Sequence, residues 1–226
     1  MPMPRERAGR SMLRKTYRYE GLGVVHQEVL QLVRPGTRVL EVGCATGCMT
    51  RALQENLDCE VHAVEPNPED AAQAAPFASQ MTVGDIGDPQ VREAVGRGYD
   101  AVIFADVLEH LVDPWETVRW VRTILCPGGC VAASVPNVAH YTVRLGLLRG
   151  RFDYAPYGLL DDTHLRFFTE RSLRALFVDN GYAIQVLKRV FLYKKHRRFA
   201  RFAPNAFTHQ FVLQAMPAGT SGSLSA

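Results

Sequence analysis

Three acidic side chains stand at or near the ends of three successive apolar segments: Glu41, Glu65 and Asp85. A carboxylate at such a position can accept two hydrogen bonds from a ribose diol, and Asp85 is suited to the amino group of an adenine. The carboxyl ends of neighbouring parallel strands meet at one edge of a sheet, where ligands bind in open α/β folds. Because like charges repel, three acids favour a neutral or positively charged nucleoside without phosphate groups.

A glycine loop, Gly43-Cys44-Ala45-Thr46-Gly47, follows the first of these segments. Glycine at the end of a strand permits a tight turn and a close approach of the ligand. The loop lacks the second and third glycines of a dinucleotide-binding fingerprint, and no Gly-Lys-Ser/Thr follows it, so neither a nicotinamide cofactor nor a P-loop nucleotide is predicted. The residues expected to bind the nucleoside are Glu41, Gly43, Cys44, Ala45, Gly47, Glu65, Pro66, Asp85, Ile86 and Asp106.

Histidine is the side chain best suited to remove a proton near neutral pH. His110 follows the fourth apolar segment, at the same predicted edge, and His164 lies in a stretch that interrupts the repeating pattern. We expect these two to be the catalytic residues. The expected substrate contacts are His140, Tyr154 and Arg166. The histidines expected to be structural or solvated are His62, His196 and His209.

The spacing of Asp106, Glu109 and His110 would place two carboxylates and an imidazole on one face of a helical turn. Such a trio could hold a divalent cation. A local role of Glu109 in capping or ion pairing is the simpler interpretation, so a metal ion is not expected.

Short apolar segments alternate with helical ones over the first two thirds of the chain. The expected strands are residues 38–42, 61–65, 81–84, 101–105 and 130–135. The expected helices are residues 20–33, 47–56, 68–75, 89–95 and 114–125, with Asp113 as an N-cap. This alternation predicts a mostly parallel sheet with helices on both faces. Later expected elements are a helix over 137–148, a helix capped by Thr169, and strands at 182–193 and 207–215.

The chain reads as one domain, residues 17–216, between a flexible basic arm (1–16) and a Gly/Ser-rich disordered tail (217–226). No second core is apparent. Residues 137–168 break the strand–helix rhythm, and we expect them to form an insertion on the substrate side.

Composition narrows the class of protein. The chain has 226 residues, of which 47% are hydrophobic and 22% charged, values typical of a globular fold. No apolar run is long enough to span a bilayer, and we see no secretory signal, so a cytoplasmic protein without membrane contact is expected. The five cysteines form no C-x-x-C pair, which disfavours a zinc site.

Positive charge is concentrated in residues 1–20 and 188–201, whereas the whole chain carries only +3. Such runs can bind nucleic acid or another anionic partner. A solvated connection between strands is the simpler interpretation of the second run, so nucleic-acid binding is kept only as an alternative.

The segment Glu41-x-Gly43-x-Ala45-x-Gly47 resembles the first motif of the class I S-adenosylmethionine-dependent methyltransferases, with Ala where many members have Gly. In that family Glu65 matches the ribose acid and Asp85 the adenine-side acid. Residues 99–129, ending in Pro-Gly-Gly, resemble the segment from the fourth to the fifth strand. Residues 106–111 and 159–168 are similar to a bacterial subgroup of small-molecule and sugar-tailoring enzymes.

This resemblance implies a Rossmann-like seven-stranded sheet whose last strand is antiparallel, and S-adenosylmethionine as cofactor. It implies methylation of a small-molecule biosynthetic intermediate, such as a natural product, by a monomer or homodimer. We expect O-methylation with deprotonation by histidine. N-methylation of a small molecule and methylation of nucleic acid are the alternatives.

Overall fold

The computed structural model of the chain describes residues 22–193 and 200–219. The predicted basic arm, residues 194–199 of the second basic run, and the tail from residue 220 onward therefore lie outside the described residues. Among the described helices, none combines the length and the apolar character needed to cross a membrane.

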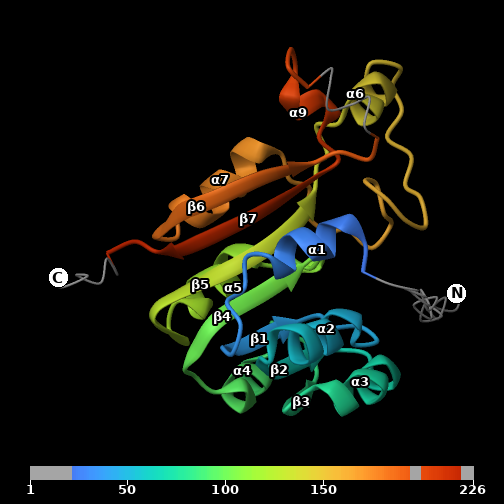
Figure 1. The fold of residues 1–226 in the computed structure, drawn as a ribbon. Helices are drawn as coiled ribbons and strands as arrows, with labels where there is room; N and C mark the ends of the chain where they lie inside the picture. Colours follow the sequence, from blue (N-terminus) through green and yellow to red (C-terminus); the bar gives the residue numbers. More distant parts are fainter. Residues whose placement is uncertain (1–21, 194–199, 220–226) are drawn as a thin grey trace, which may run out of the picture.

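Seven strands form a single sheet in the order β3-β2-β1-β4-β5-β7-β6 (Figure 1). Their bounds are β1 Arg38–Val42, β2 Glu60–Glu65, β3 Gln80–Val83, β4 Tyr99–Ala105, β5 Leu125–Pro136, β6 Tyr182–Val190 and β7 Gln210–Pro217. The first five are parallel to one another, whereas β7 runs antiparallel between β5 and β6. The predicted fold class is confirmed, including the antiparallel last strand.

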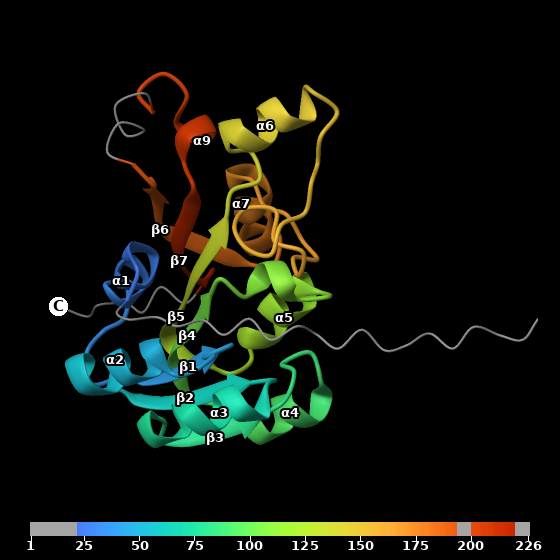
Figure 2. The same ribbon diagram turned by 90° about the vertical axis from the view of Figure 1, so that its right-hand side faces the viewer.

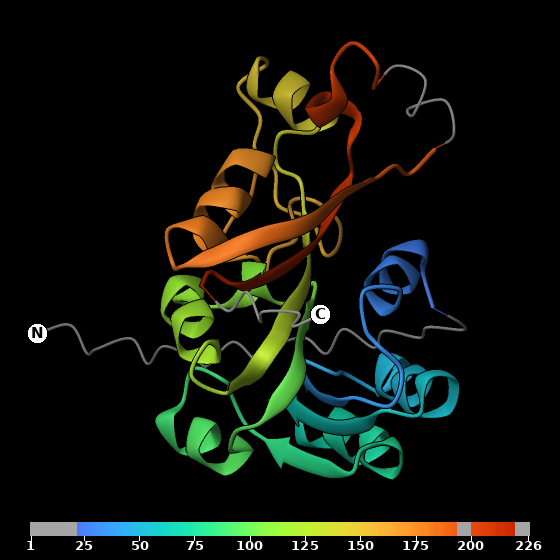
Figure 3. The same cartoon turned by 60° about the vertical axis from the view of Figure 1, so that its left-hand side comes forward.

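Helices cover both faces of the sheet, with α1 and α2 on one side and α5 and α7 on the other (Figure 3). Their bounds are α1 Val24–Leu30, α2 Cys48–Leu57, α3 Pro68–Ala74, α4 Pro89–Val95, α5 Pro114–Val121, α6 Tyr141–Leu147, α7 Glu170–Val178 and α9 Pro204–Phe207, with short 3₁₀ turns η1 Ala75–Phe77 and η2 Leu108–His110.

Two apolar cores explain why the central strands are continuously hydrophobic. In β4, Val102 and Phe104 pack into the core shared with α5 and α7, whereas Ala101 and Ile103 pack into the core shared with α1 and α2. Successive side chains of a strand point to opposite faces, so a strand covered on both sides must be apolar at every position.

Helix starts follow their sequence signals. Asn67, Asp88 and Asp113 each accept a backbone N–H of the first turn, and a proline follows each of them. Thr169 begins α7 in a capping box with Ser172. Both predicted caps, Asp113 and Thr169, are therefore present.

Element ends differ from the predictions where tertiary hydrogen bonds compete with the helix. Helix α5 ends at Val121 instead of residue 125, because the Ile124 carbonyl accepts the N–H groups of Gly98 and Tyr99 and the chain then enters β5. The strand predicted at 207–215 begins later, after the short α9, and continues to Pro217.

Residues 137–168 leave the sheet at the end of β5 and return to it at a bridge between Asn137 and Phe168. The helix predicted at 137–148 is confined to α6, because Asn137 is fully buried and its amide donates to the carbonyls of Asn205 and Thr208. Figures 1 and 2 show α6 beside α9 at this end of the molecule, and the Tyr141 and Phe207 rings lie 5.5 Å apart there.

Candidate functional site

The three predicted acids lie at the carboxyl ends of three adjacent strands: Glu41 within β1, Glu65 as the last residue of β2, and Asp85 just after β3. The Gly43 N–H donates to the Val64 carbonyl, and the Gly84 N–H donates to the Glu65 carbonyl. These bonds align the segments that leave β1, β2 and β3. We call this region, comprising the loop 43–47 with Glu65 and Asp85, the nucleoside edge.

The glycine loop has no space for side chains at its ends. Gly43 and Gly47 have φ angles of 73° and 83°, which L side chains rarely adopt. A Cβ at Gly47 would lie 2.6 Å from the Ala74 backbone in α3, and one at Gly43 would lie 2.6 Å from a Val107 methyl. Close packing on both sides therefore requires glycine, and it places the loop directly against the segment that leads into η2.

Glu65 is fixed in a position suited to a ribose. Its Oε2 accepts the Ala45 N–H at 2.9 Å and its Oε1 accepts the Asn67 N–H at 2.9 Å. Each oxygen retains a further lone pair, which fits a diol. Burial raises the pKa of Glu65, while the two backbone hydrogen bonds lower it.

Asp85 and its neighbours complete the nucleoside edge. The exposed Asp85 carboxylate accepts the Gly87 N–H at 2.7 Å, and Pro66 is exposed beside Glu65. The side chain of Ile86, which we predicted to contact the nucleoside, instead packs in the core. The residues present fit an adenosyl group, because a preorganised diol acceptor at the end of β2 and an exposed carboxylate after β3 lie beside a loop that begins and ends with glycine.

Glu41 differs from the other two acids. It is 3% exposed, and Thr50 donates a hydrogen bond of 2.7 Å to its Oε2. Burial raises the pKa of Glu41 to about 8, so this carboxyl is mostly neutral at pH 7. The nearby Cys44 thiol is buried as well, and its pKa is raised by desolvation. Glu41 therefore contributes little negative charge to this edge of the sheet.

The two predicted catalytic residues meet although they are far apart in the sequence. The rings of His110, in η2, and His164 lie 4.8 Å apart, edge to face. Atoms of Glu109, His110 and His164 that could bind a proton or a cation all lie within 4.8 Å of one another. We call these three residues, with Thr163, the histidine cluster.

Glu109 is the member of this cluster that the sequence assigned no role in binding or catalysis. Its side chain is 1% exposed, and no described group forms a hydrogen bond with its Oε2. Burial, with the nearby Asp106, raises the pKa of Glu109 well above its usual value. Its backbone carbonyl accepts the N–H groups of Leu165 and Arg166, which joins η2 to the insertion. The sequence signal for Glu109 was its spacing from Asp106 and His110.

The structure does not bring the predicted cation trio together. Asp106 has a φ angle of 57°, so it is not part of a helical turn with Glu109 and His110. Its Oδ1 accepts hydrogen bonds from Ser134 at 2.6 Å and Gln210 at 3.0 Å. The three side chains that offer possible cation ligands within 4.8 Å of one another are instead Glu109, His110 and His164.

Aromatic side chains continue the cluster toward solvent. Phe167 lies 6.1 Å from His164 and 5.5 Å from Phe152, and Phe152 lies 5.6 Å from the exposed Tyr154, measured between ring centroids. Tyr154, a predicted substrate contact, thus joins the two histidines through a continuous wall of rings.

The other predicted substrate contacts lie elsewhere. His140 packs against His209 and Tyr141, near α9, and its Nδ1 lies 2.8 Å from the Thr142 hydroxyl. Arg166 donates to the Val112 carbonyl and stacks on the Trp115 ring. The sequence had suggested a substrate contact for Arg166, whereas here its guanidinium joins the insertion to the segment before α5 and to the Trp115 ring.

Two members of the second basic run form ion pairs within the fold. Lys188 lies 2.7 Å from Glu28, and Arg189 lies 2.7 Å from Glu170. Their charges are therefore neutralised locally and do not support an anion-binding surface.

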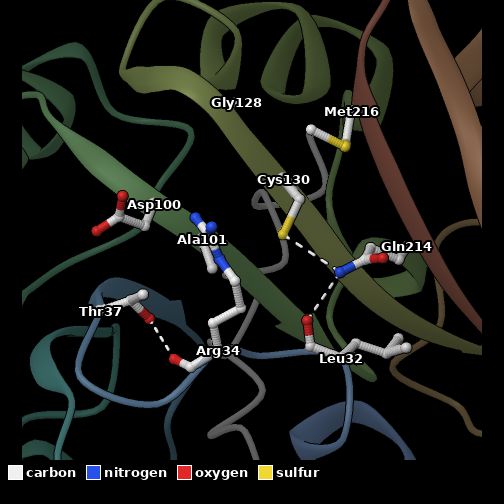
Figure 4. Close-up of a pocket in the computed structure, with 9 residues that line it drawn as sticks. All are labelled: Leu32, Arg34, Thr37, Asp100, Ala101, Gly128, Cys130, Gln214 and Met216. Atoms are coloured by element: carbon white, nitrogen blue, oxygen red, sulfur yellow. Dashed lines mark hydrogen bonds between the residues drawn. The ribbon is translucent and has the colours of Figure 1, made fainter. Parts of the chain in front are cut away.

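A small cavity of about 190 Å³ is shown in Figure 4. It lies near the amino end of β4, at the edge of the sheet opposite to the nucleoside edge. Asp100 and Ala101 from the start of β4 line it, together with Cys130 and Gln214. The amide of Gln214 closes one side by donating to the Leu32 carbonyl and to the Cys130 sulfur. Since His110 follows the far end of β4, this cavity is not part of the nucleoside edge or the histidine cluster.

Comparison with known proteins identifies the family. A profile described as a methyltransferase domain matches residues 14–186. The ubiquinone biosynthesis O-methyltransferase of Psychrobacter arcticus is 27% identical over 177 residues, which are 71% of this chain and 64% of that protein. The enzyme of the same name from Xanthomonas campestris is 32% identical over 107 residues, 46% of this chain and 44% of that protein. The chain thus spans less than two thirds of the length of these relatives.

Solved structures share the fold. The CcbJ methyltransferase of Streptomyces caelestis has a TM-score of 0.63 at 16% identity, covering 88% of this chain and 91% of its own. Magnesium protoporphyrin IX methyltransferase from Synechocystis PCC 6803, solved with bound SAH, has a TM-score of 0.60 at 17% identity, with coverages of 86% and 80%. With a profile match over most of its length and this fold, the chain belongs to the class I S-adenosylmethionine-dependent methyltransferases.

Proposed function

We propose that the chain methylates a hydroxyl group on a small aromatic or other ring-bearing biosynthetic intermediate, with His110 or His164 removing the hydroxyl proton. The observation that carries this proposal is the contact between the two histidines, 4.8 Å apart, immediately after β4. The names of the curated relatives support the O-directed reaction.

The position of the histidine cluster supports a role next to the cofactor. Val107, directly before η2, packs on Gly43 so tightly that a Cβ there would meet its methyl group. The nucleoside edge and the histidine cluster are therefore neighbours along one edge of the sheet. A hydroxyl group held against the histidines would face the adenosyl site.

S-adenosylmethionine, when bound, supplies a methyl group whose bond to sulfur breaks, leaving its electron pair on sulfur, as the bond to the acceptor oxygen forms. The chain binds the nucleoside through Glu65 and Asp85, and positions the acceptor beside the loop. The histidine accepts the hydroxyl proton and later releases it to solvent. An amine acceptor would not need such a base, since its free lone pair attacks directly.

The wall of rings from His164 to Tyr154 supports a flat acceptor. Aromatic side chains bind rings by stacking and by edge contacts. The ion pairs of Lys188 and Arg189 give no support to a nucleic-acid substrate.

The test is a methyl-transfer assay with matched acceptors: catechol and 3,4-dihydroxybenzoate against the corresponding anilines, with a hydroxylated sugar as a third class. We expect transfer to the hydroxyl compounds, and a loss of about 100-fold or more in His110→Ala or His164→Ala, typical of a missing general base. Cofactor affinity, measured by calorimetry with S-adenosylhomocysteine, should stay unchanged in both variants. Turnover of anilines alone, or full activity of both alanine variants, would refute the proposal.

A further inference from the structure

The environment of His110 determines which ring nitrogen carries the proton. Its Nδ1 lies 3.2 Å from the backbone carbonyl oxygen of Thr163 and 3.2 Å from the Thr163 hydroxyl oxygen. A carbonyl oxygen can only accept a hydrogen bond. The Nδ1 atom must therefore donate, which places the proton on Nδ1.

The Thr163 hydroxyl gives the same assignment independently. It donates its single proton to the Asp161 carboxylate, 2.6 Å away. Toward His110 the hydroxyl oxygen can then only accept. Two oxygens of one residue thus require a donor at Nδ1, and in the neutral imidazole the basic lone pair is then on Nε2.

Asp161 is built into this arrangement. Its side chain is 3% exposed, and its Oδ1 accepts the Thr163 N–H at 2.9 Å in addition to the hydroxyl. Its backbone carbonyl accepts the His164 N–H. One buried residue therefore fixes the turn that carries both Thr163 and His164.

We propose that Asp161 and Thr163 are positioning residues that keep the proton of His110 on Nδ1, so that Nε2 is the atom that accepts the proton of the substrate hydroxyl. This inference rests on the proposed function for its chemical role. When Nε2 takes up the proton, the imidazolium still donates from Nδ1 to Thr163, and the Asp161 charge stabilises it through the hydroxyl.

The pH dependence of the cluster has several contributors. Besides Asp161, the titratable groups of this cluster among the described residues are Glu109 on the same turn as His110, His164 on the insertion, and Asp106, whose charge acts on Glu109. All three are present in every variant below, so differences between variants report on Asp161 and Thr163.

The first measurement needs no variant. In ¹⁵N-labelled protein with bound S-adenosylhomocysteine, His110 is assigned by comparison with His110→Gln, and its two nitrogen shifts report the tautomer. We expect the proton on Nδ1 of the neutral ring. A neutral ring with its proton on Nε2 would overturn the proposal, whatever the activity.

The second measurement compares Asp161→Asn, Thr163→Val and Thr163→Ser, with the exposed neighbour Asp162→Asn as the matched control. With catechol as acceptor, we expect Asp161→Asn and Thr163→Val to lower kcat about 10-fold, at unchanged affinity for S-adenosylhomocysteine. The acid limb of the rate profile should move to lower pH, because the imidazolium loses its support. Thr163→Ser keeps the hydroxyl, so its kcat and its acid limb should match those of the wild type.

The outcomes separate this inference from the proposed function. Full activity of His110→Ala refutes a His110-based reaction but leaves the tautomer measurement standing. An inactive His110→Ala beside Asp161→Asn and Thr163→Val variants that match the control in kcat and in pH profile refutes the positioning role alone. Retained affinity for S-adenosylhomocysteine shows that a variant is folded.

Discussion

The nucleoside edge and the histidine cluster lie side by side, but they are built differently. At the nucleoside edge, carboxylates are fixed by backbone N–H groups of the strand ends: Asn67 and Gly87 lie two residues after Glu65 and Asp85, and Ala45 of the adjacent loop also donates to Glu65. In the histidine cluster, His110 contacts a residue 53 positions later in the chain. The nucleoside edge is therefore formed by the strand ends themselves, whereas the histidine cluster forms only when the insertion packs against η2.

On the proposed function, this difference separates cofactor binding from catalysis. A nucleoside site at the ends of adjacent strands is aligned by backbone hydrogen bonds between the segments that leave them. A site made by docking an insertion can change with the insertion's sequence, while the sheet stays the same. The comparison predicts that mutations at one site affect cofactor affinity and those at the other affect turnover.

The largest effect on cofactor binding is expected for Glu65→Ala. The variant loses the charged acceptor for the ribose diol and releases the Ala45 N–H. Hydrogen bonds to charged groups contribute about 1.5–3 kcal/mol, so we expect a loss of affinity of about 100-fold for S-adenosylhomocysteine by calorimetry. The exposed Glu93→Ala, on α4, is the control. Unchanged affinity in Glu65→Ala would remove the main support for the nucleoside edge.

The nucleoside edge could be predicted from the sequence more completely than the histidine cluster. Local patterns predicted the strands and the helix caps at Asp113 and Thr169, and the structure contains them. Local patterns also predicted the tight turn that begins at Gly43 and ends at Gly47, and both residues have positive φ angles. The position of Glu65 follows from the order of neighbouring strands, which the α/β pattern implies.

The histidine cluster could be predicted only as separate residues. His110 and His164 were each singled out, but no periodicity reports a contact across 53 residues. The predicted grouping of Asp106 with Glu109 assumed a helical turn, and the positive φ of Asp106 prevents it. Arg166 was expected to bind substrate because its charge is visible in the sequence, whereas its Val112 partner is a backbone carbonyl, which no sequence pattern marks.

The buried carboxyls lead to a second prediction, which concerns how the free energy of unfolding changes with pH. The pKa of Glu41 is about 8 in the folded chain and about 4.3 when unfolded. Between these values the folded state holds more protons, so stability falls as pH rises from about 4.5 to 8. Glu41→Gln should flatten this fall by about 3.5 kcal/mol between pH 5 and pH 8 in urea unfolding, leaving the shares of Glu65 and Glu109, whose pKa values burial also raises. Parallel curves for Glu41→Gln, wild type and Glu93→Gln would contradict a neutral Glu41.

The smallest effect is expected where the insertion docks on the rest of the fold. Arg166→Leu removes the hydrogen bonds to Val112 and the contact with the Trp115 ring, which we expect to lower the free energy of unfolding by about 1 kcal/mol. Turnover should fall several-fold, because the Thr163–His164 turn then docks less firmly on η2. Affinity for S-adenosylhomocysteine should not change, since no residue of the nucleoside edge is involved.

The exposed Arg171→Leu, on α7, controls for the loss of a surface charge. A drop in cofactor affinity with Arg166→Leu would show that the insertion also supports the nucleoside edge, and the two sites would then be one mechanical unit. Loss of turnover at constant cofactor affinity would instead show that Arg166 acts through the position of the insertion. The packing of the insertion on η2, and not the strand ends, would then determine how the two histidines are placed against the acceptor hydroxyl.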